Sequence, residues 1–188
     1  MPGTWGSLIA MAFGLGSAIG CFALMGERLR FLFDWDTGRI GLVYAVFGLL
    51  TLVGNMIMPW ALRHTGNGRV LMRIALLFVL LAIVITYAFN SAGYFLTGAA
   101  LLTWALFGGL GAPGLQTHIA QLSPTRRGML MALAGSSMNL GVAGASALAA
   151  TVYPFGAVWI AVLAVVCITI AIIALRPVGE SRAERASA

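Results

Sequence analysis

The sequence predicts an all-α integral membrane protein with six transmembrane helices. Hydrophobic residues make up 61% of the 188-residue chain and charged residues only 9%, whereas ordinary soluble domains are about 25% charged. Every charged side chain lies in one of four short segments, residues 27–39, 63–73, 126–127 and 176–185. A charge at the centre of a spanning helix costs about 2.5–3.5 kcal/mol on insertion scales, so a chain in lipid keeps its ionisable groups near helix ends.

The first three helices follow from the apolar stretches of the first half of the chain. A helix needs about 20 apolar residues to cross roughly 30 Å of hydrocarbon. Residues 1–26 therefore hold one helix, and residues 40–62 hold a second, whose start Asp36 or Thr37 can cap. The first stretch has no basic leader and no cleavage site, so we expect a retained helix rather than a signal peptide. The third helix begins near the basic residue Arg69.

The last three helices come from stretches that are too long for a single span. Residues 74–125 are interrupted by the polar cluster at 90–93, which separates the third helix from the fourth. Residues 128–175 divide at Tyr153-Pro154 into the fifth and sixth helices. The predicted helices form one domain over residues 1–188, with a short cytoplasmic tail at 176–188, and they cover residues 4–26, 38–62, 70–89, 94–119, 128–150 and 155–175.

The arginines predict the orientation of these helices. If six helices alternate sides, one side carries only Arg28, Arg30 and Arg39. The other side carries Arg63, Arg69, Arg73, Arg126, Arg127, Arg176, Arg182 and Arg185. The positive-inside rule then places both termini in the cytoplasm, as in a multi-pass protein of the cytoplasmic (inner) membrane. The net charge of +6 does not predict a nucleic-acid partner, because these charges mark loops rather than one clustered patch.

No group of residues in the sequence predicts catalysis, a cofactor or a metal. The chain has no paired carboxylates, no phosphate-binding glycine loop and no nucleophile near a base. Cys21 and Cys167 lie inside predicted helices without a partner at ligand spacing. His118 is a possible proton site near the end of the fourth helix, and a hydrated, hydrogen-bonded histidine is the alternative. We therefore expect no enzyme activity.

The second helix carries one face of candidate pathway residues. Tyr44, Phe47, Thr51 and Asn55 follow one another at helical spacing and share a side of the helix. A polar side chain in lipid prefers the interior of a bundle or a wet cavity, so this face is a candidate lining for a solute pathway. Hydrogen bonds from Thr51 or Asn55 to a neighbouring helix, and ordinary aromatic packing, are the alternatives.

Three other helices add candidates to this lining. The first helix presents Phe13 and Ser17, and the fourth presents Trp104, with Gln116 closer to its end. The fifth helix places Ser136 and Asn139 near the membrane midplane, where an amide needs partners. Together these residues would form an apolar, aromatic and weakly polar surface suited to a lipophilic ligand.

The fourth helix also contains a glycine-rich segment that weakens its hydrogen-bond ladder. Residues 108–114 include Gly111 and Pro113, and proline supplies no backbone N–H. Broken helices line cavities in transporters, so a functional bend is one interpretation of this segment. A simple packing kink is the other.

The loops of the predicted bundle resemble those in half of a major facilitator superfamily transporter. Residues 59–69 (PWALRHTGNGR) are similar to the superfamily's basic loop pattern G-x-L-x-D-R-x-G-R-R, with Gly66 as its second glycine and Arg69 as its final basic residue. Pro59 replaces the leading glycine and Arg63 stands at the acidic position, as in degenerate copies from C-terminal halves.

Two further segments resemble drug and sugar efflux permeases of the drug:proton antiporter branch. Residues 115–128 (LQTHIAQLSPTRRG), followed by 136–144, are similar to the junction of their tenth and eleventh helices. Residues 33–42 resemble the entry to their eighth helix. The resemblance adds Arg126, Arg127 and Gly128 to the loop and gating candidates Gly66, Arg69, Gly111 and Pro113.

The resemblance implies alternating access, with the first, second, fourth and fifth helices lining a central cavity and the other two at the periphery. It implies efflux of a small lipophilic or sugar-like solute, and a second six-helix half supplied by a separate chain or by a homodimer. The N-terminal half, which carries the main acidic coupling residues of this branch, is not in this sequence. The alternative is a non-transporting membrane protein or a truncated fragment that acts as a structural or assembly partner.

Overall fold

The structure is a computed structural model that describes residues 4–176, and it is helical through this range, without a β-strand among the described residues. The predicted tail beyond Arg176 lies outside the described residues. In chain order the elements are α1 (Thr4–Ile9), the π-helical segment η1 (Ala10–Gly16), α2 (Ser17–Phe22), α3 (Met25–Phe33), α4 (Thr37–Thr65), α5 (Gly68–Ala88), α6 (Tyr94–Gln121), the short 3-10 helix η2 (Pro124–Arg126), α7 (Arg127–Val152), the short 3-10 helix η3 (Tyr153–Phe155) and α8 (Val158–Ala174).

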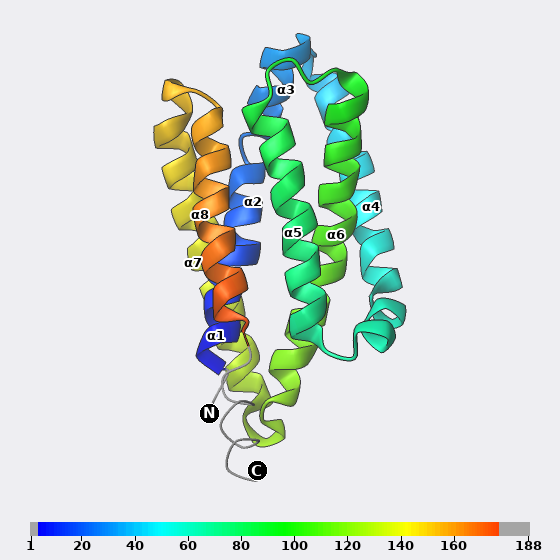
Figure 1. Ribbon diagram of the computed structural model, residues 1–188, viewed down its shortest axis with the longest axis vertical. Helices are drawn as coiled ribbons and strands as arrows, with labels where there is room; N and C mark the ends of the chain where they lie inside the picture. Colours follow the sequence, from blue (N-terminus) through cyan, green and yellow to red (C-terminus); the bar gives the residue numbers. More distant parts are fainter. Residues whose placement is uncertain (1–3, 177–188) are drawn as a thin grey trace, which may run out of the picture.

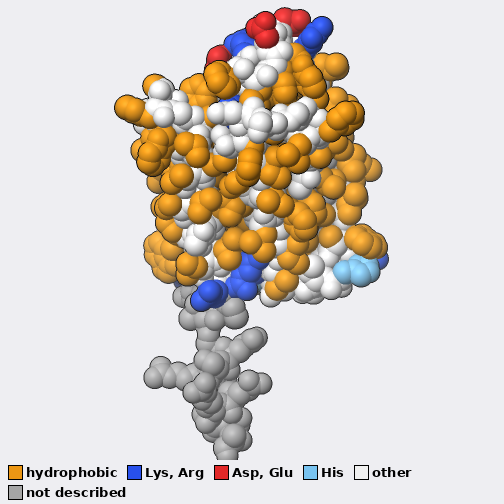
Figure 2. All heavy atoms as spheres, turned by 45° about the horizontal axis from the view of Figure 1, so that its top comes forward, with side chains coloured by type: hydrophobic (Ala, Val, Ile, Leu, Met, Phe, Trp, Pro, Cys, Tyr) orange, Lys and Arg blue, Asp and Glu red, His pale blue; other side chains and the backbone are white. Residues whose placement is uncertain are grey.

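Several of these helices are long and apolar enough to cross a membrane. Five candidate spans occur among the described residues, at Thr4–Phe22, Thr37–Thr65, Gly68–Ala88, Tyr94–Gln121 and Pro124–Phe155. The remaining apolar helix, α8, has 17 residues and is shorter than these spans. Figure 2 shows an apolar belt on the visible face, with acidic side chains at one end of the bundle and arginines at both. These features are consistent with a multi-pass membrane protein.

The helices form two groups that lie side by side (Figure 1). In one group α6 packs along both α4 and α5, and in the other α7 and α8 pack against the first span, which consists of α1, η1 and α2. Contacts between α5 and α8 join the two groups. Gly6 in α1 approaches the backbone carbonyl of Ala174, so the first span starts at the end where α8 finishes.

Glycines allow the helices to cross at close range in both groups. A Cβ added at Gly16 would lie 2.9 Å from the Cα of Gly141, and one at Gly20 would lie 2.6 Å from the Cβ of Ala145, so the first span and α7 meet at small residues. In the other group, an added Cβ at Gly54 or at Gly109 would collide with backbone of the facing helix. Such small-residue crossings replace the hydrophobic driving force that helices lack in lipid.

The first predicted helix, at residues 4–26, differs from the structure at its far end. The first span stops at Phe22, and a separate short helix, α3, follows a break at Ala23 and Leu24. Sequence reasoning left residues 27–37 as a charged loop between two helices because charges mark the ends of spans. Yet α3 buries Arg28 and Leu29 against the bundle, so part of this segment belongs to the folded core.

Arg28 ties α3 to the end of α5. Its side chain is 1% exposed, and its Nε donates a hydrogen bond of 2.8 Å to the carbonyl oxygen of Thr86. Its Nη2 donates a second hydrogen bond, of 3.3 Å, to the carbonyl oxygen of Phe89. Carbonyls at the C-terminus of a helix lack intrahelical partners and carry a partial negative charge, which a cation stabilises. Arg28 therefore caps α5 from a different helix.

Asp36 caps the start of α4, which confirms one of the two predicted caps. Its Oδ1 accepts a hydrogen bond of 2.9 Å from the backbone N–H of Arg39. This hydrogen bond lowers the pKa of the Asp36 carboxyl below its ordinary value, because it favours the charged form.

The cap predicts an acid-dependent loss of stability. Because the pKa is lowered on folding, the stabilisation is present above the ordinary carboxyl pKa and is lost as the pH falls through the lowered value. Thermal unfolding of the purified chain, followed between about pH 6 and pH 3, is expected to show a smaller acid-induced decrease for Asp36→Asn than for the wild type. Asparagine caps a helix without titrating. An equal decrease in both proteins would contradict this assignment.

Candidate functional site

A cavity with a volume of about 390 Å³ lies between the two helix groups. The side chains of α2, α4, α5 and α6 form its walls, and α7 contributes Met138. The cavity adjoins the glycine-rich segment of α6, where Gly108, Gly109 and Gly111 line it. An added Cβ at Gly108 would meet no atom within 4 Å, so this glycine faces open space.

Aromatic rings form one wall of this cavity. The ring of Phe22 lies 4.4 Å from that of Phe47 and 5.8 Å from that of Trp104, measured between centroids. The rings of Phe47 and Trp104 lie 6.2 Å apart in an edge-on arrangement. Trp104 is only 3% exposed, so the packing of α6 against the bundle fixes the position of its indole ring. A rigid aromatic wall of this kind suits an apolar or planar ligand.

Three polar side chains interrupt the apolar lining. Thr51 donates a hydrogen bond of 2.9 Å from its hydroxyl to the carbonyl oxygen of Phe47 on its own helix. The amides of Asn55 and Gln116 make no hydrogen bond to any other described residue. Asn55 is exposed and Gln116 is half-buried. Both amides therefore retain donors and acceptors for a ligand, for water or for a second protein surface.

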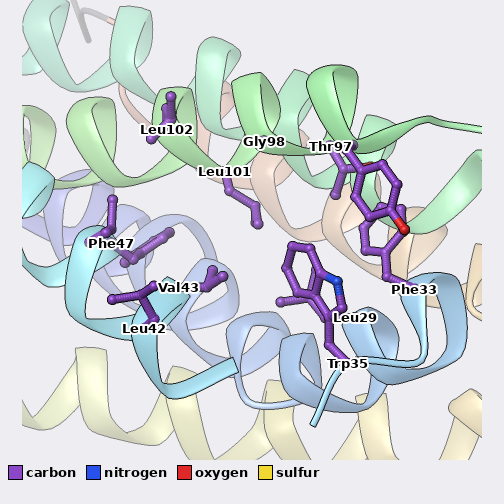
Figure 3. A pocket seen from close by; sticks show the side chains of 12 residues that line it. Leu29, Phe33, Trp35, Leu42, Val43, Phe47, Thr97, Gly98, Leu101 and Leu102 are labelled. Atoms are coloured by element: carbon purple, nitrogen blue, oxygen red, sulfur yellow. The ribbon is translucent and has the colours of Figure 1, made fainter. Parts of the chain in front are cut away.

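A second, smaller cavity of about 230 Å³ lies between α3, α4 and α6, nearer the acidic end (Figure 3). The side chains of Trp35 and Leu101 point into it from opposite sides. The Phe33 and Tyr94 rings stack at 4.4 Å, and Trp35 stacks on Tyr94 at 5.9 Å. Phe47 lines both this cavity and the larger one, so it lies between the two.

A third cavity, of about 250 Å³, lies at the opposite end, where α4 passes into α5. It is more polar, and its lining includes Asn67, Thr117 and His118. The Nε2 atom of His118 is shielded from solvent and has no hydrogen-bond partner among the described residues. Gly66, a predicted loop candidate, lines this cavity and ends α4 with a positive φ of 67°, a conformation that glycine adopts without strain.

The structure brings five of the predicted pathway residues together in the central cavity. They are Phe47, Thr51, Asn55, Trp104 and Gln116, from two helices that are distant in sequence. Tyr44 lies beside them, with its ring 5.1 Å from that of Phe22, and its hydroxyl accepts a hydrogen bond of 3.0 Å from the backbone N–H of Gly26.

The other four pathway candidates do not line this cavity. Phe13 is 42% exposed, and Ser17 is buried with its hydroxyl donating to the carbonyl oxygen of Phe13. Ser136 and Asn139 are exposed on α7. They face away from the cavity because α7 packs on the first span through Gly141 and its neighbours.

The remaining loop and gating candidates lie in different surroundings. Gly111 packs against α5, since an added Cβ would lie 2.6 Å from that of Ala75. Pro113 lies within α6, which continues through it as one helix. Three exposed residues, Arg126, Arg127 and Gly128, mark the start of α7, and Arg69 begins α5.

Sequence reasoning missed Phe22 and the contribution of α5 to the cavity. Phe22 of α2 completes the aromatic wall, and α5 supplies Met72, Ala75, Leu76 and Val79. The resemblance placed the third helix at the periphery, and nothing in the pattern of α5 distinguishes a cavity wall from a lipid-facing side. An aromatic residue near the end of the first span was the only available signal for Phe22.

No model of a known protein family matches this chain, and neither a curated protein nor a solved structure matches it. The resemblance to a major facilitator half therefore stays a prediction from the sequence.

Proposed function

We propose that this chain is one half of a secondary transporter of the major facilitator type, in the cytoplasmic (inner) membrane with both termini inside. In this proposal it contributes to alternating-access export of a small lipophilic or sugar-like solute. The central cavity carries the proposal, because it combines an aromatic wall with two amides that have no partner among the described residues. Binding sites for small molecules are typically concave, largely apolar and provided with a few polar groups.

The size of the cavity supports a small solute. At about 390 Å³ it lies near the lower end of the range typical of ligand pockets, roughly 300–1,000 Å³. The Phe22, Phe47 and Trp104 rings offer stacking surfaces to a lipophilic molecule or to the apolar face of a sugar ring. The Asn55 and Gln116 amides can donate to hydroxyl groups and accept from them.

A second six-helix half is the proposed partner, either another chain or a second copy. Much of α4 and α7 is exposed in the single chain, including the amides of Asn55 and Asn139. An amide in hydrocarbon lacks hydrogen-bond partners, so these faces are better suited to a protein surface or a water-filled pathway than to lipid. A partner on the α4 side would enclose the cavity beside Asn55.

Asn55→Leu tests the cavity without removing a buried side chain. The change leaves the aromatic wall in place and removes the amide, so we expect a roughly tenfold weaker binding of a cavity ligand, corresponding to about 1.4 kcal/mol. The measurement is equilibrium binding of ethidium, as a lipophilic probe, and of a thiogalactoside, as a sugar-like probe. Asn90→Leu, in the loop between α5 and α6, is the matched control and is expected to bind as the wild type does.

Transport itself requires a second measurement on the same preparation. The mass of the purified chain in nanodiscs gives its oligomeric state, and probe uptake into proteoliposomes gives its activity. Uptake by a dimer that decreases in Asn55→Leu and not in Asn90→Leu would support a homodimeric transporter. A monomer that neither binds nor moves either probe would contradict autonomous transport and favour the assembly-partner alternative.

A further inference from the structure

A group of arginines that form no ion pair with a described residue lies at the end of the bundle where α5 begins. Arg69 and Arg73 are separated by one helical turn and share a side of α5. Arg176 follows the end of α8, which packs against α5. Among residues 4–176 the acidic side chains are Glu27, Asp34 and Asp36, all at the opposite end (Figure 2).

Several nitrogen atoms of this group are shielded yet unpaired. Nε of Arg69, and both Nε and Nη2 of Arg73, are inaccessible to solvent and have no hydrogen-bond partner in the described structure. A guanidinium group presents five N–H donors in a fixed planar arrangement, and leaving shielded donors unpaired is costly. The arrangement is therefore incomplete without an acceptor, and an anionic acceptor would also offset the mutual repulsion of the arginines.

The depth of Arg73 indicates where the anion lies. Arg73 stands five residues after the first residue of α5, and a helix rises about 1.5 Å per residue, so it lies roughly 7 Å inside this helix end. An ionisable residue inside a spanning helix is normally paired or placed at a functional position. Near the end of a span, the anions that such an arginine meets are the phosphates of the lipid headgroups.

We propose that Arg69, Arg73 and Arg176 form a binding site for a phosphate group, supplied by the headgroup of an anionic phospholipid. Guanidinium groups match the geometry of phosphate oxygens and bind them in pairs of hydrogen bonds. One feature favours a lipid over free phosphate: Arg73 lies within α5, a helix long and apolar enough to cross a membrane, and close to the end of that helix. This phosphate site is proposed independently of the proposed transport function.

Lipid-dependent stability of the full chain in detergent tests this site. The unfolding temperature is measured with added phosphatidylglycerol, with phosphatidylcholine and with inorganic phosphate. We expect phosphatidylglycerol to raise the wild-type unfolding temperature more than phosphatidylcholine does, and Arg73→Gln to lose most of that difference. Arg63→Gln is the matched control, because it removes the same charge from an exposed position near the end of α4, and it should respond as the wild type does.

A second variant keeps the test decisive if Arg73→Gln does not fold. Arg176→Gln removes an exposed member of the same group and is expected to reduce the response to phosphatidylglycerol. A full wild-type response in both folded variants, or in Arg176→Gln alone, would overturn the site. A stabilisation by inorganic phosphate that equals that of phosphatidylglycerol and disappears in the variants would support the phosphate chemistry and overturn the lipid source.

Discussion

Replacing Arg28 with alanine is expected to lower the free energy of unfolding by about 3 kcal/mol. The guanidinium group donates to the carbonyl oxygens of Thr86 and Phe89, at 2.8 and 3.3 Å, from an almost fully buried position. A hydrogen bond to a charged group contributes about 1.5–3 kcal/mol, and relief of the buried charge offsets part of the loss. Alanine also leaves the last carbonyls of α5 without their cap.

Arg30→Ala is the matched control for this change. Arg30 lies two residues further along α3 and forms an exposed ion pair of 2.7 Å with Glu27. Exposed ion pairs contribute about 0–1 kcal/mol, so the control should lose much less stability than Arg28→Ala. Unfolding by denaturant in mixed micelles, followed by tryptophan fluorescence, compares the two variants. Equal losses would show that the bonds to α5 contribute no more than an exposed ion pair.

Replacing Gly109 with alanine is expected to cost about 1–3 kcal/mol, because it forces two packed helices apart. A Cβ at this position would collide with the carbonyl oxygen of Thr51 on α4 and would lie 2.9 Å from the Cα of that residue. Backbone atoms of a helix cannot move aside as the end of a flexible side chain can. Gly54 on α4 lies similarly close to the backbone of α6. Neither helix therefore has space for a side chain at this crossing.

The neighbouring residue provides the control for this prediction. Gly108→Ala introduces the same methyl group in the same helix, but an added Cβ there would meet no atom within 4 Å. We expect its stability to equal or exceed that of the wild type, since alanine favours the helix by about 1 kcal/mol over glycine. Reversible unfolding of both variants under the same conditions measures the difference. If Gly109→Ala were as stable as Gly108→Ala, the close crossing of α4 and α6 would be wrong.

The comparison of Gly109→Ala with Gly108→Ala also separates glycines at helix crossings from glycines that face open space. Spacing in the sequence marks Gly16, Gly20, Gly108 and Gly141 alike as small residues of spanning helices. Only the tertiary structure assigns Gly16, Gly20 and Gly141 to a close crossing and Gly108 to open space. Spacing along one helix defines a face, and the partner of that face depends on how the helices are rotated against one another.

In the candidate site, too, the sequence predicts which residues share a face of a helix, and the tertiary structure decides which faces line the cavity. The common face of Phe47, Thr51 and Asn55 follows from helical periodicity, and these residues do line one cavity. For the first span, periodicity favoured Phe13 and Ser17, whereas Phe22 supplies the aromatic wall. In a membrane protein the exterior is as apolar as the core, so the sequence pattern does not indicate which side of a helix faces inward.

The sequence by itself determined the all-helical class, the apolar stretches long enough to cross a membrane and the placement of charge at their ends, because the cost of charge in hydrocarbon acts on each segment separately. It also determined the local cap at Asp36, which depends on neighbouring backbone alone. Only the tertiary structure decided that Arg28 is a buried cap of α5, that α5 walls the cavity, and that Arg69 and Arg73 hold shielded nitrogens without a partner among the described residues. Those features arise from contacts between distant segments, whose rotation and depth are set by packing at small residues and by satisfaction of buried polar groups.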